Sequence, residues 1–382
     1  MSVRQRFASL YRKWLALPPW TGALLALVIL VVITASMNPA FLRGENVLNV
    51  LRQSSFWGII ALGMTFVIIL GGIDLSVGSV VAFGGGLSIV VMNTAIEATT
   101  LVSRYQTAVE QSLAPPCGAV RYGLARLFLA CGVGGSEGFG VAAAFVAALL
   151  AGLLAGWITG LLVTKGRLAS FIATLGGLAA YRSLVLVLAN GGELRSQSLD
   201  LFKVIGAGGI PIPGTNLARA GSQPIPLLIP WPVVLFLLFA VLSHILLTRT
   251  RYGRYVVAVG CNERAAVYSA INVERIKLLT YVLIGFLTGV AALLVASRMN
   301  SVSSSSTGLY FELDVIAAVV IGGTSMVGGK GTIVGTVIGV LILGFVGNML
   351  NLLQVSPYLQ GLVKGLIIIT AVLVQRRPGG EE

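Results

Sequence analysis

The stretch RTRYGRYVVAVGCNERAAVYSAINVERIK, residues 249–277, decides how this chain folds. Eight of its residues are charged, although only 10% of the whole chain is charged. Apolar runs flank it on both sides, at Ile225–Leu247 and Leu278–Ala296. Each run is about as long as the ~20 residues that a helix needs to cross a bilayer. The pattern predicts two membrane-spanning helices joined by a charged, helix-forming loop that is presented to something in the aqueous phase.

The overall composition is also that of a membrane protein. The 382 residues are 56% hydrophobic, and their mean hydropathy is +0.94, values typical of a chain surrounded by lipid. The net charge of +13 does not indicate nucleic-acid binding, because no basic stripe stands apart from the apolar runs. Lys and Arg instead mark the loops on the cytoplasmic side. We therefore expect a single transmembrane domain over residues 1–382.

Hydropathy predicts an all-α polytopic protein with about ten membrane-spanning helices. The apolar segments lie at 20–37, 54–72, 75–93, 138–163, 169–189, 225–247, 278–296, 313–327, 331–353 and 358–374. The segment at 313–327 is short for a span and is expected to be broken or re-entrant.

The distribution of basic residues predicts the orientation. Ten spans place both termini on one side, and 15 of the 26 Lys and Arg residues fall on that side, including six within 249–277. Because Lys and Arg in short loops face the cytoplasm, both termini and residues 249–277 are expected to be cytoplasmic. Residues 94–137 are expected to form an extracytoplasmic insertion.

The sequence shows no catalytic or metal-binding pattern. The chain has a single histidine, His244, inside an apolar segment, and its three cysteines lack metal-site spacing. The segment GGTSMVGGKGT at 322–332 only partly matches a phosphate-binding loop. That loop needs Gly six positions before its Lys and Ser or Thr directly after it, where this chain has Thr324 and Gly331. We expect no enzyme activity, cofactor or metal in this chain.

The motif GGIDLSVGS at 71–79 interrupts the apolar sequence with a carboxylate, Asp74. A charge at membrane depth is costly and marks a functional-site candidate, so Asp74 and Ser76 are candidates for the translocation path or gate. Arg182, which falls inside a predicted span, is a third candidate. An Asp-x-Ser sequence also caps a following helix, and this structural interpretation stays open.

Two rows of glycine repeat at four-residue spacing, one starting at Gly152 and one at Gly331. This spacing allows membrane helices to approach each other closely. Both rows therefore predict tight helix packing.

Within the charged loop, residues 262–270 have the pattern of a short exposed helix. Asn262 suits the N-cap position and Glu263 the first turn, where the helix dipole favours a negative charge. A face of small residues, which fits the groove of another protein, is formed by Ala265, Ala266, Ser269 and Ala270.

Five segments together resemble the permease subunits of bacterial ABC importers for ribose, xylose, galactose, arabinose and autoinducer-2. They are GGIDLSVGS (71–79), SFIATLGGLAAYRSLVLVLANG (170–191), AVGCNERAAVYSAINVERIKLLTYVLIGFLTGVAALLVASR (258–298), ELDVIAAVVIGGTSMVGGKGT (312–332) and SPYLQGLVKGLIII (356–369). The resemblance covers nearly the whole chain, and the order and spacing of the segments make it specific.

The resemblance implies a subunit of the bacterial inner membrane that carries a monosaccharide, with a pentose such as ribose or xylose favoured. It implies three partners: a second permease copy or paralogue, a cytoplasmic ATPase that binds ATP and Mg²⁺, and a periplasmic sugar-binding protein. By position, Glu263–Val273, including Ile271, would be the coupling helix that docks into the ATPase. Cys261 and Ala270 stand where relatives commonly have Gly, and the insertion at 94–137 is larger than most relatives carry.

An ion-coupled secondary transporter of a small polar solute is the alternative function. Such a protein needs a buried, paired network of ionisable groups. This chain offers only Asp74, Arg182 and Lys364 as candidates for such a network.

Topology also restricts the cysteines. Cys117 and Cys131 both fall in the extracytoplasmic insertion, whereas Cys261 falls on the cytoplasmic side, where disulfides are rare. A Cys117–Cys131 disulfide is therefore the one sensible pairing. The alternative is that Cys131, inside the apolar run Leu124–Val133, is simply packed in lipid or protein.

Overall fold

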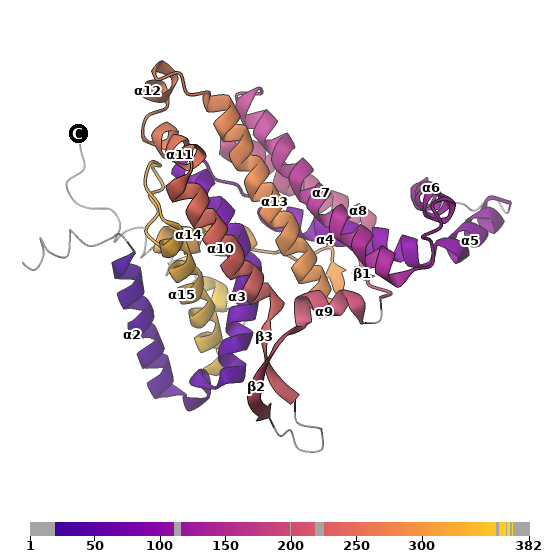
Figure 1. The fold of residues 1–382 in the computed structure, drawn as a ribbon, viewed down its shortest axis with the longest axis horizontal. Coiled ribbons are helices and arrows are strands. Elements are labelled where there is room, and N and C mark those ends of the chain that lie inside the picture. Colours follow the sequence, from indigo (N-terminus) through magenta and orange to yellow (C-terminus); the bar gives the residue numbers. More distant parts are fainter. Residues whose placement is uncertain are drawn as a thin grey trace, which may run out of the picture.

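The computed structural model describes residues 20–110, 116–198, 200–217, 225–356, 359–363, 365–366 and 369. Within these ranges, seven helices are long and apolar enough to cross a membrane, and they form one bundle (Figure 1). They are α3 (Gly44–Ile69), α4 (Val77–Ile96), α7 (Glu137–Thr164), α8 (Ser170–Leu188), α10 (Trp231–Arg249), α13 (Val273–Met299) and α15 (Ile333–Leu352). The shorter α2 (Thr21–Met37) is also apolar. The predicted all-α polytopic membrane fold is confirmed.

The shorter elements lie mainly at the ends of the bundle. α11 (Arg251–Cys261) and α12 (Glu263–Tyr268) lie at one end, and the strands β2 and β3 lie at the other (Figure 1). In the described ranges, two antiparallel pairs are formed, β1 (Glu193–Arg195) with β4 (Ser301–Ser303) and β2 (Gly209–Leu217) with β3 (Ile225–Pro230). The other described elements are η1 (Pro39–Leu42), α5 (Ala98–Glu110), α6 (Pro116–Ala130), α9 (Leu201–Ala207) and α14 (Phe311–Ile321).

The helix boundaries differ from the predicted spans in three places. α3 begins at Gly44, ten residues before the predicted start at 54. The prediction began too late because the first turns of α3 are polar and lower the hydropathy there. The segment predicted at 225–247 begins as strand β3, and α10 starts only at Trp231, with a proline in its first turn. α14 has 11 residues, too few to cross a bilayer alone. The last predicted span, 358–374, lies largely outside the described residues.

The core of the bundle is built around α3. Of the most apolar 18-residue window of α3, 89% is buried, and every residue from Ser54 to Ile69 is buried. The helices that contact α3 most are α10, α13, α14 and α15. The half of α3 that lies nearer to α12 is therefore packed on all sides by protein.

Both predicted glycine rows lie where two helices meet at close range. A side chain at Gly152 would collide with the backbone of Gly285 in α13, and one at Gly335 would collide with the Gly322 carbonyl that follows α14. Small residues at such contacts let helix backbones approach within a membrane. The packing interpretation of both rows is confirmed.

The insertion at 94–137 is a helical hairpin of α5 and α6 that projects sideways from the bundle (Figure 1). The rings of Tyr105 and Tyr122 stack with their centroids 4.6 Å apart and so join the two helices. Arg121 Nε donates to Thr94 Oγ1 at 3.3 Å and ties the hairpin to α4.

The predicted Cys117–Cys131 disulfide is not compatible with α6. Cys117 lies in the first turn of this helix and Cys131 directly follows its last residue. Fourteen residues of helix separate two Cα atoms by about 21 Å, whereas a disulfide needs roughly 4.4–6.8 Å. Cys131 is accordingly a free, exposed thiol, and the side chain of Cys117 lies outside the described part of the chain. The exposure of Cys131 also speaks against packing within this chain.

Candidate functional site

The charged loop that connects α10 to α13 folds into two capped helices. Asn262 Oδ1 accepts from the backbone N–H of Ala265 at 3.0 Å and caps α12, as predicted. Glu263 lies in the first turn of α12, and its Oε1 pairs with Lys277 Nζ at 2.7 Å. Asn272 then caps α13 by accepting from the backbone N–H of Arg275. The segment is therefore a defined structure and not a flexible connection.

Tyr252 fixes α11 against the bundle. Its hydroxyl lies 2.7 Å from Thr280 Oγ1 in α13. Burial raises the pKa of Tyr252 to about 12, so the phenol stays neutral and keeps this hydrogen bond over the physiological range. This hydrogen bond joins α11 to α13.

The exposed face of α12 differs from the predicted one. Ala266 is only 4% exposed and packs into the main hydrophobic core, so it does not belong to the docking face. Ala265 and Ser269 are exposed as predicted. Tyr268, which the sequence analysis missed, is 89% exposed, and the neighbouring Val267 is exposed as well. A large aromatic side chain left in water on a short, rigid helix is typical of a protein contact.

Ala270 has a backbone conformation that suits glycine. Its φ is 58°, in the left-handed region, where a side chain costs about 1–2 kcal/mol. The chain turns here because the backbone N–H of Ile271 donates to the carbonyl of Ala266 at 3.1 Å and closes α12.

We expect Ala270→Gly to stabilise the protein by about 1 kcal/mol, because glycine adopts this φ without strain. Thermal unfolding of the purified protein in detergent measures the change. The control, Ala265→Gly within α12, should shift stability in the opposite direction, since glycine disfavours helix by about 1 kcal/mol. An unchanged or lower midpoint for Ala270→Gly would show that this turn carries no strain.

The end of α11 meets two other segments at a tight junction. The backbone N–H of Gly329, in the loop between α14 and α15, donates to the carbonyl of Ile69 at the end of α3 at 2.8 Å. Gly260 in α11 lies so close to that carbonyl that any side chain would collide with it. Cys261 Sγ lies 3.6 Å from the carbonyl oxygen of Gly329. The junction of Ile69, Gly260 and Gly329 thus connects α11 to both α3 and the α14–α15 loop.

Asp74 lies in the turn that follows this junction and is 3% exposed. Its Oδ1 accepts from the backbone N–H of Ser76 at 2.8 Å and from the Ser76 hydroxyl at 2.6 Å. Asp74 therefore shapes the turn before α4, with Ser76 at the N-cap position. Neither residue lines the polar cavity described below, and their role in a path or gate stays a prediction.

Arg182 forms hydrogen bonds with a loop at the end of the bundle opposite α12. Its Nη1 donates to the carbonyls of Ser304 and Thr307 at 3.1 and 3.0 Å. This loop follows β4 and leads into α14. Arg182 does not line the polar cavity either, so the structure does not bring the three predicted path residues together there.

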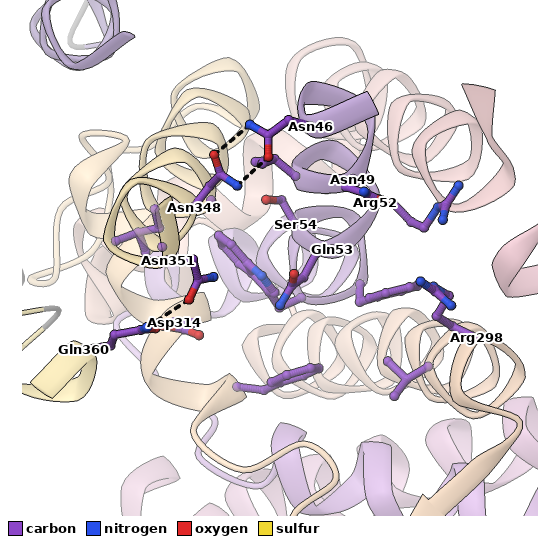
Figure 2. Close-up of a pocket in the computed structure, with 18 of the residues that line it drawn as sticks. Asn46, Asn49, Arg52, Gln53, Ser54, Arg298, Asp314, Asn348, Asn351 and Gln360 are labelled. Carbon is purple, nitrogen blue, oxygen red and sulfur yellow. Dashed lines mark hydrogen bonds between the residues drawn. The ribbon is translucent and has the colours of Figure 1, made fainter. Parts of the chain in front are cut away.

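A polar cavity that the sequence analysis missed lies between α3, α13, α14 and α15 (Figure 2). Its volume is about 660 Å³, within the roughly 300–1,000 Å³ of small-molecule sites. The polar lining residues are Asn46, Asn49, Arg52, Gln53, Ser54, Arg298, Asp314, Asn348, Asn351 and Gln360. Phe56, Trp57 and Phe311 add aromatic surface. The cavity lies in the half of the bundle away from α12.

Two walls of the cavity are joined by a reciprocal pair of carboxamides. Asn46 Nδ2 donates to Asn348 Oδ1 at 2.9 Å, and Asn348 Nδ2 donates back to Asn46 Oδ1 at 2.8 Å (Figure 2). Gln360 Nε2 donates to Asn351 Oδ1 at 2.9 Å. The Asn46–Asn348 pair joins α3 to α15, and the Gln360 bond ties the segment that follows α15 to that helix.

Comparison with known proteins identifies the family. Residues 46–372 match the family model described as branched-chain amino acid transport system / permease component. The ribose import permease protein of Bacillus subtilis (strain 168) is 40% identical over 360 residues, covering 93% of this chain and 92% of that protein. No solved structure matches.

Two other relatives show the same coverage. The ribose import permease protein of Escherichia coli (strain K12) is 37% identical over 93% of both chains. The D-allose transport system permease protein of the same strain is 32% identical over 93% of this chain and 91% of its own. Together with the seven helices able to span a membrane, these matches lead to one conclusion: the chain belongs to this family of transport-system permease components, and it is a multi-pass protein of the bacterial inner membrane.

Proposed function

We propose that this chain is the membrane-spanning subunit of an ABC importer that carries a monosaccharide, with a pentose such as ribose or xylose favoured. The observation that carries the proposal is α12, a capped helix whose Tyr268 is 89% exposed at the end of the bundle predicted to be cytoplasmic. The choice of a sugar rests on the names of the relatives, two of which are ribose import permeases. ATP and Mg²⁺ would be bound by a separate ATPase.

The contacts of α11 support a coupling route from α12 to the polar cavity. Movement of α12 by an ATPase would pass through α11 to the junction of Ile69, Gly260 and Gly329. From there it would reach α3 and the α14–α15 loop. The helices α3, α14 and α15 form three walls of the cavity. ATP hydrolysis outside this chain could thus open and close a solute path within it.

Two further partners complete the proposed assembly. A periplasmic sugar-binding protein would deliver the solute at the end opposite α12. A second permease copy would suit α8, since only 22% of the apolar window of this helix is buried. Gly176, Ala179 and Ser183 are exposed on α8, and small residues favour close packing of membrane helices.

Reconstitution in proteoliposomes tests the proposal. The permease and its ATPase are placed in the membrane, Mg-ATP is trapped inside, and binding protein with radiolabelled ribose is added outside. We expect accumulation that requires hydrolysable ATP and survives ionophores. Accumulation that is driven by a proton or sodium gradient without ATP would instead make the protein a secondary transporter.

The role of Asp74 is tested by two substitutions. Asp74→Asn keeps an oxygen that accepts from Ser76, so we expect nearly normal folding and uptake. Asp74→Ala leaves the buried N–H and hydroxyl of Ser76 without this acceptor and should destabilise the fold by about 1–3 kcal/mol. Thermal unfolding and sugar uptake are measured on both variants. A folded Asp74→Asn protein without uptake would assign the negative charge to the path or gate.

A further inference from the structure

We infer that the polar cavity of Figure 2 is a binding site for the sugar itself, at which the solute rests after it leaves its delivery protein. This inference rests on the proposed function. It adds a solute-binding site within the membrane bundle and assigns the side chains that contact the hydroxyl groups.

The first observation is the concentration of carboxamides. The seven spanning helices contain six Asn and Gln side chains. Five of them line this one cavity, namely Asn46, Asn49, Gln53, Asn348 and Asn351. The sixth, Asn93, binds the backbone at Arg195 and Gln197. Polar side chains inside a membrane are costly, so this clustering indicates a polar occupant.

The second observation concerns two arginines in the same lining. Arg52 in α3 has a buried Nε without a hydrogen-bond partner among the described residues, and Arg298 in α13 lines the same cavity. Among the described residues, neither recorded ion pair involves Arg52 or Arg298. A buried donor without an acceptor is unfavourable, so the pair favours a ligand that supplies oxygen atoms.

The chemistry of the lining fits a polyol. Carboxamides both donate and accept hydrogen bonds, and a guanidinium presents parallel N–H donors. Neighbouring sugar hydroxyls can donate to and accept from the carboxamides and can accept from the guanidinium. Within the part of the chain that the structure describes, the side chains of Asn49 and Gln53 line the cavity, form no hydrogen bond and remain available for the solute. Trp57 and Phe311 offer apolar surface to the C–H groups of a sugar ring. Two arginines against the single carboxylate of Asp314 disfavour a cationic solute.

The depth of the cavity agrees with a transport intermediate. Its lining extends along α3 from Asn46 to Trp57, which is about 17 Å of helix and ends near the middle of α3. From there to Ile69, α3 is completely buried. The cavity is thus closed toward α12 and lies in the half where a periplasmic protein would deliver the sugar.

Two kinds of variant test the site. Asn49→Leu combined with Gln53→Leu removes two carboxamides that are proposed to bind the sugar hydroxyls. Neither carboxamide forms a hydrogen bond with another described residue. Gly347→Leu fills the cavity, and no atom lies within 4 Å of the added Cβ. The matched controls lie outside the cavity. Gln106→Leu removes an exposed carboxamide on α5. Gly123→Leu adds the same side chain on α6, where no atom lies within 4 Å of the added Cβ. Retention of the ATPase on purification checks the fold of each variant.

Saturation-transfer NMR of ribose on the permease–ATPase complex, without binding protein, measures sugar binding directly. ATP-driven uptake measures transport. For the wild type and both controls we expect a sugar signal and uptake. For the double variant and Gly347→Leu we expect loss of the signal and at least a tenfold fall in maximal uptake, with the ATPase retained.

The two proposals can fail separately. If the wild type imports ribose and the cavity variants import it at the same rate, the cavity is not the sugar site, although the importer proposal stands. If the wild type neither imports nor binds any of several pentoses and hexoses, the sugar-importer proposal fails, and the inference fails with it.

Discussion

Replacing Tyr268 with alanine and Ala265 with aspartate is expected to abolish ATP-driven uptake while the permease stays folded in the membrane. Tyr268 is 89% exposed on α12, and Ala265 is exposed beside it. Loss of a buried aromatic anchor weakens a protein interface by about 2 kcal/mol or more, which is roughly a 30-fold loss of affinity. A carboxylate added within the contact should weaken it further. Co-purification of the ATPase and sugar uptake measure the two effects.

Val120→Ala on α6 is the control for that experiment. Val120 is also a large exposed side chain, but it lies on the hairpin predicted to be extracytoplasmic. Its replacement should leave ATPase binding unchanged. If the Tyr268 and Ala265 variant keeps both its ATPase and its uptake, α12 is not the docking helix.

Replacing Gly260 with valine is expected to separate ATPase binding from transport. Any side chain at Gly260 collides with the backbone carbonyl of Ile69, which also accepts from the N–H of Gly329. The atoms that this side chain would meet are backbone atoms of Ile69 and Gly329, which cannot rotate away as a side chain would, so the junction must open, at a cost of about 1–3 kcal/mol. Because α12 itself is unchanged, the ATPase should still bind, whereas uptake should fall at least tenfold.

Gly123→Ala on α6 is the matched control, since no atom lies within 4 Å of the added methyl group. It should be neutral or slightly stabilising, because alanine favours helix over glycine. Normal uptake by Gly260→Val would show that the junction does not transmit movement from α12.

The parts of the fold that depend on local pattern were predicted correctly from the sequence. Apolar length located seven of the ten predicted spans, and a short polar side chain before an acidic first turn located the start of α12 at Asn262. Glycine spacing predicted that the helix now seen as α7 packs closely against another helix, which the structure identifies as α13. In each case the residues that determine the feature are neighbours in the chain.

The polar start of α3 could not be predicted in this way. Asn46, Asn49, Arg52 and Gln53 lower the hydropathy, so this part of α3 looks like a loop in the sequence. These residues belong to a spanning helix because their partners and the cavity walls come from α13, α14 and α15, about 250 to 300 residues away. A row of polar residues at helical spacing, at 46, 49 and 53, was the signal available in the sequence.

The errors at the other sites have the same origin. Ala265 and Ala266 look equivalent in the sequence, but the fold turns Ala266 into the core. The two cysteines of the insertion are close in sequence, yet α6 keeps them at its opposite ends. Which face of a helix is covered depends on tertiary contacts, and a composition argument does not contain them.

Photo-crosslinking from position 268 tests the central claim most directly. A photoreactive amino acid replaces Tyr268 in the intact complex of permease, ATPase and binding protein, and the same amino acid replaces Val120 in a parallel sample. We predict a crosslink to the ATPase from position 268 and none to the ATPase from position 120. A crosslink from position 268 to the binding protein, or ATPase crosslinks from position 120 alone, would contradict the assignment of α12 as the helix through which ATP hydrolysis drives import.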